Sequence, residues 1–252
     1  MRFAGKRILV TGGARGIGAA TALAFLGAGA RVAIGATTRS SYDAFLAKHS
    51  HHAAHIVPAI GDIGTRQKAA AVVHQAVTEL GGLDVLVNAA GVFAEVAVEA
   101  VDQAHWDQTI NTNLAGTFFC SQAALPALKT SRGNIVNIAS DAGLIGYPLG
   151  AVYSASKAAV VNLTRAMVLE LAQQIRINCV CPGNVDTEMI HQAAHASGDA
   201  AGYLAKADAR SPMKRMARPG EVADAILYLA SEQASFVNGA ILSIDGGGVC
   251  GF

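Results

Sequence analysis

Tyr153 and Lys157 are the residues of this chain whose types and spacing most directly suggest chemistry. They lie four residues apart in a segment with a helical pattern, so both side chains are expected on one helical face. A tyrosine loses its proton near pH ~10, and a neighbouring ammonium group lowers that pKa. With Ser140, thirteen residues before Tyr153, they form a candidate acid–base group for proton transfer near neutral pH. A half-buried helix aromatic beside a solvated lysine is the alternative, and the rest of the chain decides between them.

The composition is that of a folded chain without a strong charge bias. The 252 residues are 52% hydrophobic and 15% charged, with a formal net charge of +1. The length suits one domain with a sizeable core, and the charge gives no reason to expect nucleic acid or an anionic membrane as partner. The four cysteines show neither metal-ligand spacing nor a disulfide framework, which indicates a reducing compartment. Without a signal-peptide pattern or a long apolar run, the chain is expected to be cytoplasmic.

Short apolar runs alternate with longer amphipathic stretches along the whole chain. The stretches predict helices that include 17–29, 65–80, 102–129 and 151–172. The apolar runs predict strands at 7–11, 31–35, 55–60, 84–88, 134–139, 175–181 and 240–245. Strands that alternate with helices imply crossover connections and a parallel sheet covered on both faces. No linker, repeat or charge block interrupts the pattern, so we predict a single α/β domain over 1–252.

Residues 184–218 depart from this alternation, because they are rich in small residues and follow a predicted strand. Ligands of open α/β sheets bind beyond the carboxyl ends of the strands, so this insertion is placed to act as a substrate lid. Its methionines, Met189, Met213 and Met216, suit an adaptable apolar cover. A surface helical hairpin without a role in binding is the alternative.

The segment TGGARGIG at 11–18 joins the first predicted strand to the first predicted helix. Gly12, Gly16 and Gly18 let the backbone turn tightly and approach a pyrophosphate at the helix N-terminus. Their spacing, G-x-x-x-G-x-G, differs from the commoner G-x-G-x-x-G. We therefore predict a dinucleotide site mainly because this glycine segment lies between a strand and a helix.

The end of the second predicted strand bears on the choice of cofactor. An NAD-binding chain usually has an acidic residue here for the ribose 2′-hydroxyl, whereas this chain has Ala36 and Thr37. Arg15 in the glycine turn, with Arg39 as a second candidate, is suited to a 2′-phosphate. We therefore predict NADP(H) in preference to NAD(H). Asp62, after the third strand, is a candidate for bonding the adenine, with capping of its own turn as the alternative.

In this order, the motifs resemble those of the short-chain dehydrogenase/reductase family over essentially the whole chain. The matching residues are Thr11-Gly12-x-x-x-Gly16-x-Gly18, Asn88-Ala89-Ala90-Gly91, Asn113, Ser140, Tyr153-x-x-x-Lys157 and Pro182-Gly183. The ordered combination is highly specific, although each motif alone is not. One departure is Ala89, where many members carry a second asparagine. The resemblance implies a Rossmann-like, doubly wound, seven-stranded parallel sheet with helices on both faces, assembled as a homotetramer.

The resemblance also implies a role for each matching residue. Tyr153 would be the general acid or base, Lys157 would lower its pKa and bind the nicotinamide ribose, and Ser140 would hold the substrate oxygen. Asn113 would anchor a water-linked proton path through Lys157, and Asn88 would also help to hold the central sheet. Further expected cofactor contacts are Ile17, Ile63, Asn88, Ala89, Gly91, Pro182, Gly183, Val185 and Thr187.

The residues expected around the substrate are mostly apolar, which favours an uncharged ketone or secondary alcohol. Candidate substrate contacts are Ser140, Phe93, Tyr147 and Met189. Asp141, Glu95 and Asn184 would add polar contacts, as for a polyol.

Two alternative functions come from different classes. The glycine turn and second strand resemble those of 3-oxoacyl-carrier-protein reductases, although 182–212 is longer than usual there and no basic patch for an acidic carrier stands out. A non-catalytic NADP(H)-binding sensor is the non-enzyme alternative. Such a sensor is expected to lack one of Ser140, Tyr153 and Lys157, and all are present.

Four histidines, His49, His51, His52 and His55, lie close together before the third predicted strand. No cysteine or carboxylate partner follows at ligand-like spacing, and the run reads as a polar loop. We therefore predict no metal site.

Overall fold

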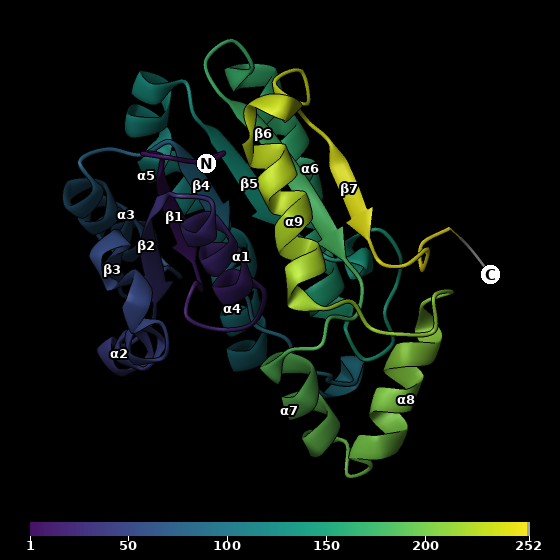
Figure 1. The fold of residues 1–252 in the computed structure, drawn as a ribbon. Helices are drawn as coiled ribbons and strands as arrows, with labels where there is room; N and C mark the ends of the chain where they lie inside the picture. Colours follow the sequence, from purple (N-terminus) through teal and green to yellow (C-terminus); the bar gives the residue numbers. More distant parts are fainter. Residues whose placement is uncertain (251–252) are drawn as a thin grey trace.

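One parallel sheet with strand order β3-β2-β1-β4-β5-β6-β7 forms the centre of the molecule (Figure 1). The computed structural model describes residues 1–250 of the chain. The strands are β1 (Arg7–Thr11), β2 (Arg31–Ala36), β3 (Ile56–Ile60), β4 (Val85–Asn88), β5 (Asn134–Ile138), β6 (Arg176–Pro182) and β7 (Ile241–Ile244). The chain reverses its direction of winding between β1 and β4. Ligands of such sheets bind beyond the carboxyl ends of the strands at that point.

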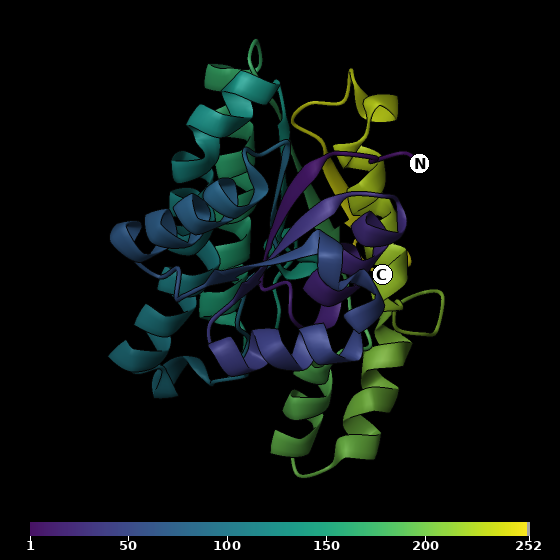
Figure 2. The same cartoon turned by 60° about the vertical axis from the view of Figure 1, so that its left-hand side comes forward.

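Alternate residues of the strands pack into hydrophobic clusters on opposite faces of the sheet. In β1, Ile8 and Val10 pack on one face, whereas Leu9 packs on the other. The first face is covered by α1 (Gly16–Gly27), α2 (Arg39–Lys48) and α9 (Pro219–Ala230). The second is covered by α3 (Arg66–Leu80), α5 (Gly116–Ser131) and α6 (Ala151–Leu171), and Figure 2 shows both layers. The predicted α/β class, seven-stranded parallel sheet and helices on both faces are confirmed.

The helix predicted over 102–129 is interrupted in the structure. It consists of α4 (Gln103–Ile110), a π-helical segment (Asn111–Ala115) and α5. A π segment inserts an extra residue into a helical turn without changing the apolar periodicity enough to be read from sequence, and such segments are frequent at functional sites. The predicted single helix was wrong at this point, and Asn113 lies in the middle of the interruption.

Residues 184–218 form mainly a helical hairpin of α7 (Glu188–Ala196) and α8 (Ala200–Arg210). Both helices project beyond the carboxyl ends of the strands, at the bottom of Figure 1 and Figure 2. The hairpin therefore lies beside the end of the sheet where ligands bind.

Within residues 1–250, no helix combines the length and the apolar character needed to cross a bilayer.

Candidate active site

A pocket between the carboxyl ends of the strands and the hairpin brings most of the predicted site residues together. Ser140, just after β5, and Tyr153 and Lys157, in the first two turns of α6, all line it. The expected cofactor contacts in its lining are Ile17, Ala89, Gly91, Pro182, Gly183, Val185 and Thr187. The expected substrate contacts Phe93, Tyr147 and Met189 line it as well. Its empty volume is about 820 Å³, with its open mouth included.

Burial governs the ionisation of Tyr153 and Lys157. It raises the pKa of Tyr153 to about 12, with the Ser140 side chain acting in the opposite direction. It also lowers the pKa of Lys157 to about 8. The Lys157 Nζ donates a hydrogen bond to the Ile138 carbonyl at 2.9 Å and lies 5.8 Å from the centre of the Tyr153 ring. Desolvation of the phenolate is the largest influence on the Tyr153 pKa, and the lowering of that pKa by Lys157 stays a prediction.

Ser140 is held by its neighbours rather than free to rotate. Its hydroxyl donates to Asp141 Oδ1 at 3.0 Å and accepts from the Ala142 amide at 3.2 Å. Asp141 is buried, and burial raises the pKa of its carboxyl group, which Arg210 opposes. The Ser140 oxygen is therefore fixed at the pocket wall, next to a carboxylate that sequence reasoning treated only as a polar neighbour.

Asn113 lies just behind the pocket rather than in its lining. Its side chain is fully buried, accepts from the Val92 amide at 2.8 Å and donates to the Val92 carbonyl at 3.0 Å and to Ser156 Oγ at 3.2 Å. A Cβ atom at Gly91 would lie 3.4 Å from Asn113 Oδ1 and 3.5 Å from Lys157 Nζ. Gly91 therefore brings the backbone close to both residues, and the loop after β4 is fixed by Asn113.

The glycine turn forms a backbone cradle next to this pocket. Gly12 has φ +62°, and a Cβ atom there would lie 2.8 Å from Ala90 Cα. A Cβ atom at Gly18 would collide with the Gly12 carbonyl. Thr11 Oγ1 accepts hydrogen bonds from the Ala89 and Ala90 amides at 3.0 and 3.1 Å, which joins the ends of β1 and β4. Sequence reasoning gave Thr11 no role of its own, although it begins the glycine motif.

This cradle fits a pyrophosphate, because its glycines let the backbone come close to the phosphates and its amides can donate hydrogen bonds to them. The turn leads into the N-terminus of α1, where unpaired amides favour negative charge. Thr187 lies beside Gly16, since a Cβ atom at Gly16 would be 3.6 Å from Thr187 Cγ2. The cradle and the Ser140–Tyr153–Lys157 group are therefore neighbouring parts of one site, joined by Ile17 and Thr187 in the pocket lining.

The residues predicted to select the cofactor lie in the glycine turn and at the end of β2. Arg15 and Thr37 are both exposed. The Arg39 side chain is already engaged, because it donates to Asp43 at 2.9 Å and stacks on Tyr42. Arg15 is therefore the better placed of the two arginines for a 2′-phosphate.

Three further expected cofactor residues have structural partners of their own. Asp62 accepts from the Gly64 amide and from Lys68 Nζ, both at 2.9 Å, so the turn-capping alternative describes its contacts. Ile63 is buried in the core beside α3 and α5. Asn88 is buried and donates to Asn137 at 2.8 Å and to Ser121 at 3.0 Å, which ties β4 to β5 and α5. None of these three side chains lines the pocket.

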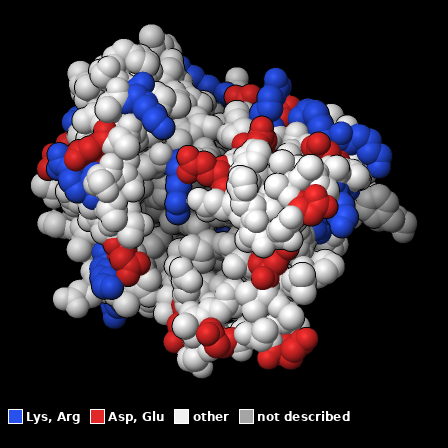
Figure 3. Space-filling model, turned by 90° about the horizontal axis from the view of Figure 1, so that it is seen from below, with Lys and Arg blue, Asp and Glu red and all other residues white. Residues whose placement is uncertain are grey.

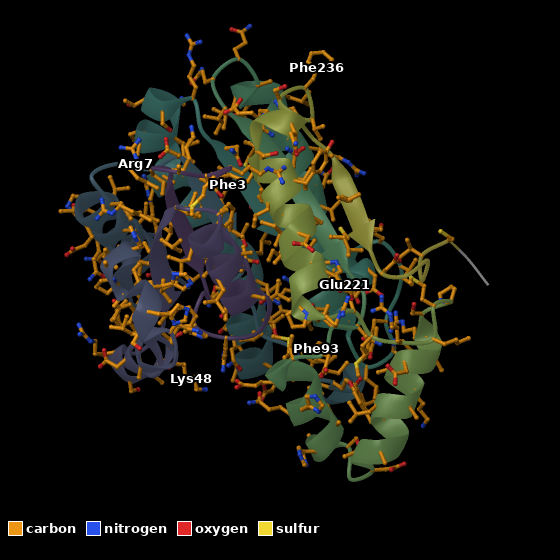
Figure 4. All side chains as sticks on the ribbon, in the orientation of Figure 1. Phe3, Arg7, Lys48, Phe93, Glu221 and Phe236 are labelled. Carbon is orange, nitrogen blue, oxygen red and sulfur yellow. The ribbon has the colours of Figure 1, made fainter. Side chains whose placement is uncertain are left out.

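The substrate side of the pocket is aromatic and apolar. Phe93 packs edge to face against Tyr153 at 4.9 Å and against Tyr147 at 5.8 Å between ring centres. In Figure 4, Phe93 lies at the lower end of the sheet, above the hairpin. The hairpin contributes Met189, which was expected, and also Ile190 and Tyr203, which were not. Sequence reasoning missed these two because only the packing of the hairpin determines which helix faces meet the pocket.

Three of the four histidines before β3 lie in a 3₁₀ helix (Ser50–His55), and His49 is its N-terminal cap. The rings of His51 and His52 pack at 4.3 Å between centres, and His49 packs on Phe45. Across residues 1–250, no group of three histidine, cysteine or acidic side chains converges as metal ligands. His49, His51 and His52 therefore have packing contacts of their own.

Comparisons with known proteins agree with this geometry. The sequence profile described as short chain dehydrogenase matches residues 6–198. The cis-4-hydroxycyclohexanecarboxylate dehydrogenase of Sinomonas cyclohexanicum is 41% identical over 249 residues, which cover 97% of each chain. The 3-oxoacyl-acyl-carrier-protein reductase FabG of Thermotoga maritima is 36% identical, with 98% of this chain and 99% of that protein covered. The solved structure of ElxO with NADP bound has a TM-score of 0.90 at 32% identity, and covers 98% of this chain and 99% of its own.

Proposed function

Because this chain belongs to the short chain dehydrogenase family, we propose that it transfers a hydride between NADP(H) and a secondary alcohol or ketone, with Tyr153 exchanging the proton. Family membership makes it an oxidoreductase that acts on a CH–OH group with a nicotinamide cofactor. The observation that carries the proposal is the single pocket lined by Ser140, Tyr153 and Lys157 beside the glycine cradle. A sensor without catalysis has no need for this group.

Tyr153 donates the proton when a carbonyl group is reduced. Its raised pKa keeps the phenol protonated at neutral pH, which suits a general acid. Ser140, fixed by Asp141 and Ala142, holds the substrate oxygen beside the phenol. When bound, the nicotinamide ring supplies or accepts the hydride. Lys157 binds the ribose and passes protons on, with Asn113 maintaining the loop next to it.

The preference for NADP(H) over NAD(H) is supported by charge at the outer end of the cradle. Arg15 is exposed in the glycine turn, and Ala36 and Thr37 stand where an NAD-binding chain usually has an acidic residue. A guanidinium group suits a phosphate monoester because it can donate two parallel hydrogen bonds. The NADP-bound ElxO neighbour supports the same choice.

A compact, mainly apolar alcohol or ketone suits the substrate side of the pocket, where Phe93, Tyr147 and Met189 form the walls. Two relatives are named for cyclic hydroxy acids, cis- and trans-4-hydroxycyclohexanecarboxylate, which supports a small ring as substrate. Reduction of a 3-oxoacyl group on a carrier protein is the second candidate, supported by the Thermotoga maritima relative. Figure 3 shows both signs of charge interspersed on the face that carries the hairpin, which favours the small molecule over an acidic carrier.

We also propose that residues 1–252 act as one domain in a cytoplasmic homotetramer, with 184–218 as the lid of the site. The hairpin side chains Met189, Ile190 and Tyr203 in the pocket lining support the lid.

The test is a panel of ketones with NADPH and NADH, and of secondary alcohols with the oxidised cofactors. We expect turnover of small cyclic ketones with a preference for NADPH. Turnover of a 3-oxoacyl carrier-protein substrate alone would favour the second candidate. Cofactor binding without turnover of any substrate would favour the sensor.

A further inference from the structure

Arg210, at the end of α8, is a cation without a hydrogen-bonded partner beside the active site. Its side chain is only 25% exposed, yet it donates no hydrogen bond to any residue within 1–250. A guanidinium group has five N–H donors and stays charged at any relevant pH. Its one ion-pair contact in the described part of the chain is with Asp141, with 3.9 Å between Nη2 and Oδ2. That separation is too long for a hydrogen bond.

Packing holds the Arg210 head in place. The guanidinium carbon lies 4.2 Å from the centre of the Tyr147 ring, close enough for a cation–π contact. Tyr147 itself is fixed, because its hydroxyl donates to Glu95 Oε1 at 3.1 Å. Tyr203, two helical turns before Arg210 on α8, donates to the same Glu95 oxygen at 2.9 Å. Glu95 therefore ties both the stacking ring and the helix that carries Arg210 to the loop after β4.

Arg210 does not itself line the pocket, but both residues that it contacts do. Tyr147 and Asp141, its two contacts, both line the pocket, and Asp141 also accepts the Ser140 hydroxyl. Asp141 already uses Oδ1 for Ser140 and for the Ala142 amide, so its bonding to the catalytic loop does not depend on Arg210. A guanidinium held in this way loses little conformational entropy when it binds an acceptor with two oxygens.

We propose that Arg210 binds a carboxylate group of the substrate, so that the enzyme acts on hydroxy acids or keto acids whose carboxylate is separated from the reacting carbon by part of an apolar skeleton. Phe93, Tyr147 and Met189 contact that skeleton. This inference rests on the proposed oxidoreductase function and narrows its substrate class, which the apolar lining alone does not do. It makes Arg210 a specificity-determining residue supplied by the lid.

The test compares 4-oxocyclohexanecarboxylate with its methyl ester, which has a similar shape and no charge. The readout is the ratio of kcat/KM for the acid to kcat/KM for the ester. Arg210→Met should lower this ratio about 10- to 100-fold, the range for a hydrogen-bonded pair with a charged group. Arg210→Lys should retain part of the preference. If Arg210 had only a structural role, the substitution would change kcat/KM for the acid and for the ester by the same factor, and the ratio would stay the same.

Lys206→Met is the matched control, because it removes an exposed cation from the same helix, one turn before Arg210. The ratio should not change in this variant. An unchanged ratio in Arg210→Met, or an equal fall in Lys206→Met, would overturn the assignment.

A binding measurement separates this inference from the proposed function. Cyclohexanecarboxylate and its methyl ester are titrated into the protein in the presence of NADP⁺, and their dissociation constants are compared. One outcome is that the enzyme turns over neither 4-oxocyclohexanecarboxylate nor its ester and still binds cyclohexanecarboxylate in a way that depends on Arg210. That result would show that the proposed reaction is wrong and that the carboxylate site is right. If the acid does not bind more tightly than the ester, the carboxylate site is wrong.

Discussion

The ammonium group of Lys157 lies over the ring of Tyr153, 5.8 Å from its centre, and donates its hydrogen bond to the Ile138 carbonyl. Lys157 is buried in α6 and Tyr153 is half-buried, and loss of water around each group disfavours its charged form. The phenol is protonated at neutral pH, and Lys157 is the group of the pair whose ionisation changes near the working pH.

The pH dependence of the reaction should follow from this arrangement. Since the pKa of Lys157 is lowered to about 8, the ammonium form is present below that pH and is lost above it. We expect ketone reduction to be constant below about pH 8 and to fall above it. Lys157→Met should lack this inflection in its residual activity, measured as kcat/KM against pH. The same inflection in the variant would assign it to another group.

Arg15 should account for most of the preference for NADPH. Arg15→Ala removes the exposed guanidinium from the glycine turn, and we expect the KM for NADPH to rise about tenfold or more, with little change for NADH. Arg39→Ala is the comparison, since Arg39 is paired with Asp43. A larger effect from Arg39 than from Arg15 would reverse their assignment.

The ion pair between Arg7 and Asp84 should contribute to stability far from the site. Arg7 donates to Asp84 through its amide, Nε and Nη2, and Figure 4 shows Arg7 toward the opposite end of the sheet from Phe93. Asp84→Asn should lower the free energy of unfolding by about 1.5–3 kcal/mol. The exposed pair of Asp43 with Arg39 offers a control, and Asp43→Asn should cost about 0.5 kcal/mol or less. Chemical denaturation of both variants measures the difference, and equal losses would contradict this account.

The pKa of Asp84 determines how acid changes the stability that the Arg7–Asp84 pair contributes. Burial alone would raise the pKa of Asp84, but the hydrogen bonds from Arg7 outweigh it and lower the pKa below its usual range. The stabilising contribution is therefore complete above the unfolded pKa of ~3.9 and is lost as pH falls through the lower folded value. Wild type and Asp84→Asn should converge in stability in strong acid.

The strands were predictable because continuous apolar runs bounded by polar or glycine residues leave few alternatives. The predicted run at 31–35 became β2 (Arg31–Ala36), and the helix predicted at 151–172 became α6 (Ala151–Leu171). The π segment around Asn113 was not predictable, because an extra residue in a helical turn hardly changes the apolar pattern. The hydrogen bonds of Asn88 are those expected of a residue that holds the central sheet, whereas its assignment to the cofactor rests on motif membership alone.

The pKa values of the site residues depend on how deeply the fold buries them, and the spacing of residues in the sequence does not show this. The four-residue gap between Tyr153 and Lys157 predicted their proximity but not the effect of burial, which raises the Tyr153 pKa. The roles of Tyr203 and Arg210 depend on how the hairpin packs against Glu95 and Tyr147. Long-range contacts of this kind follow from the fold and not from local sequence.

The most direct test of the account is the turnover of Tyr153→Phe, measured together with its affinity for NADPH. The substitution removes only the phenolic oxygen, so the edge-to-face packing against Phe93 should persist. We predict a loss of turnover of about 10²- to 10⁴-fold, the usual contribution of a general acid, with NADPH binding largely unchanged. Near-normal ketone reduction by this variant would contradict the assignment of Tyr153 as the proton donor.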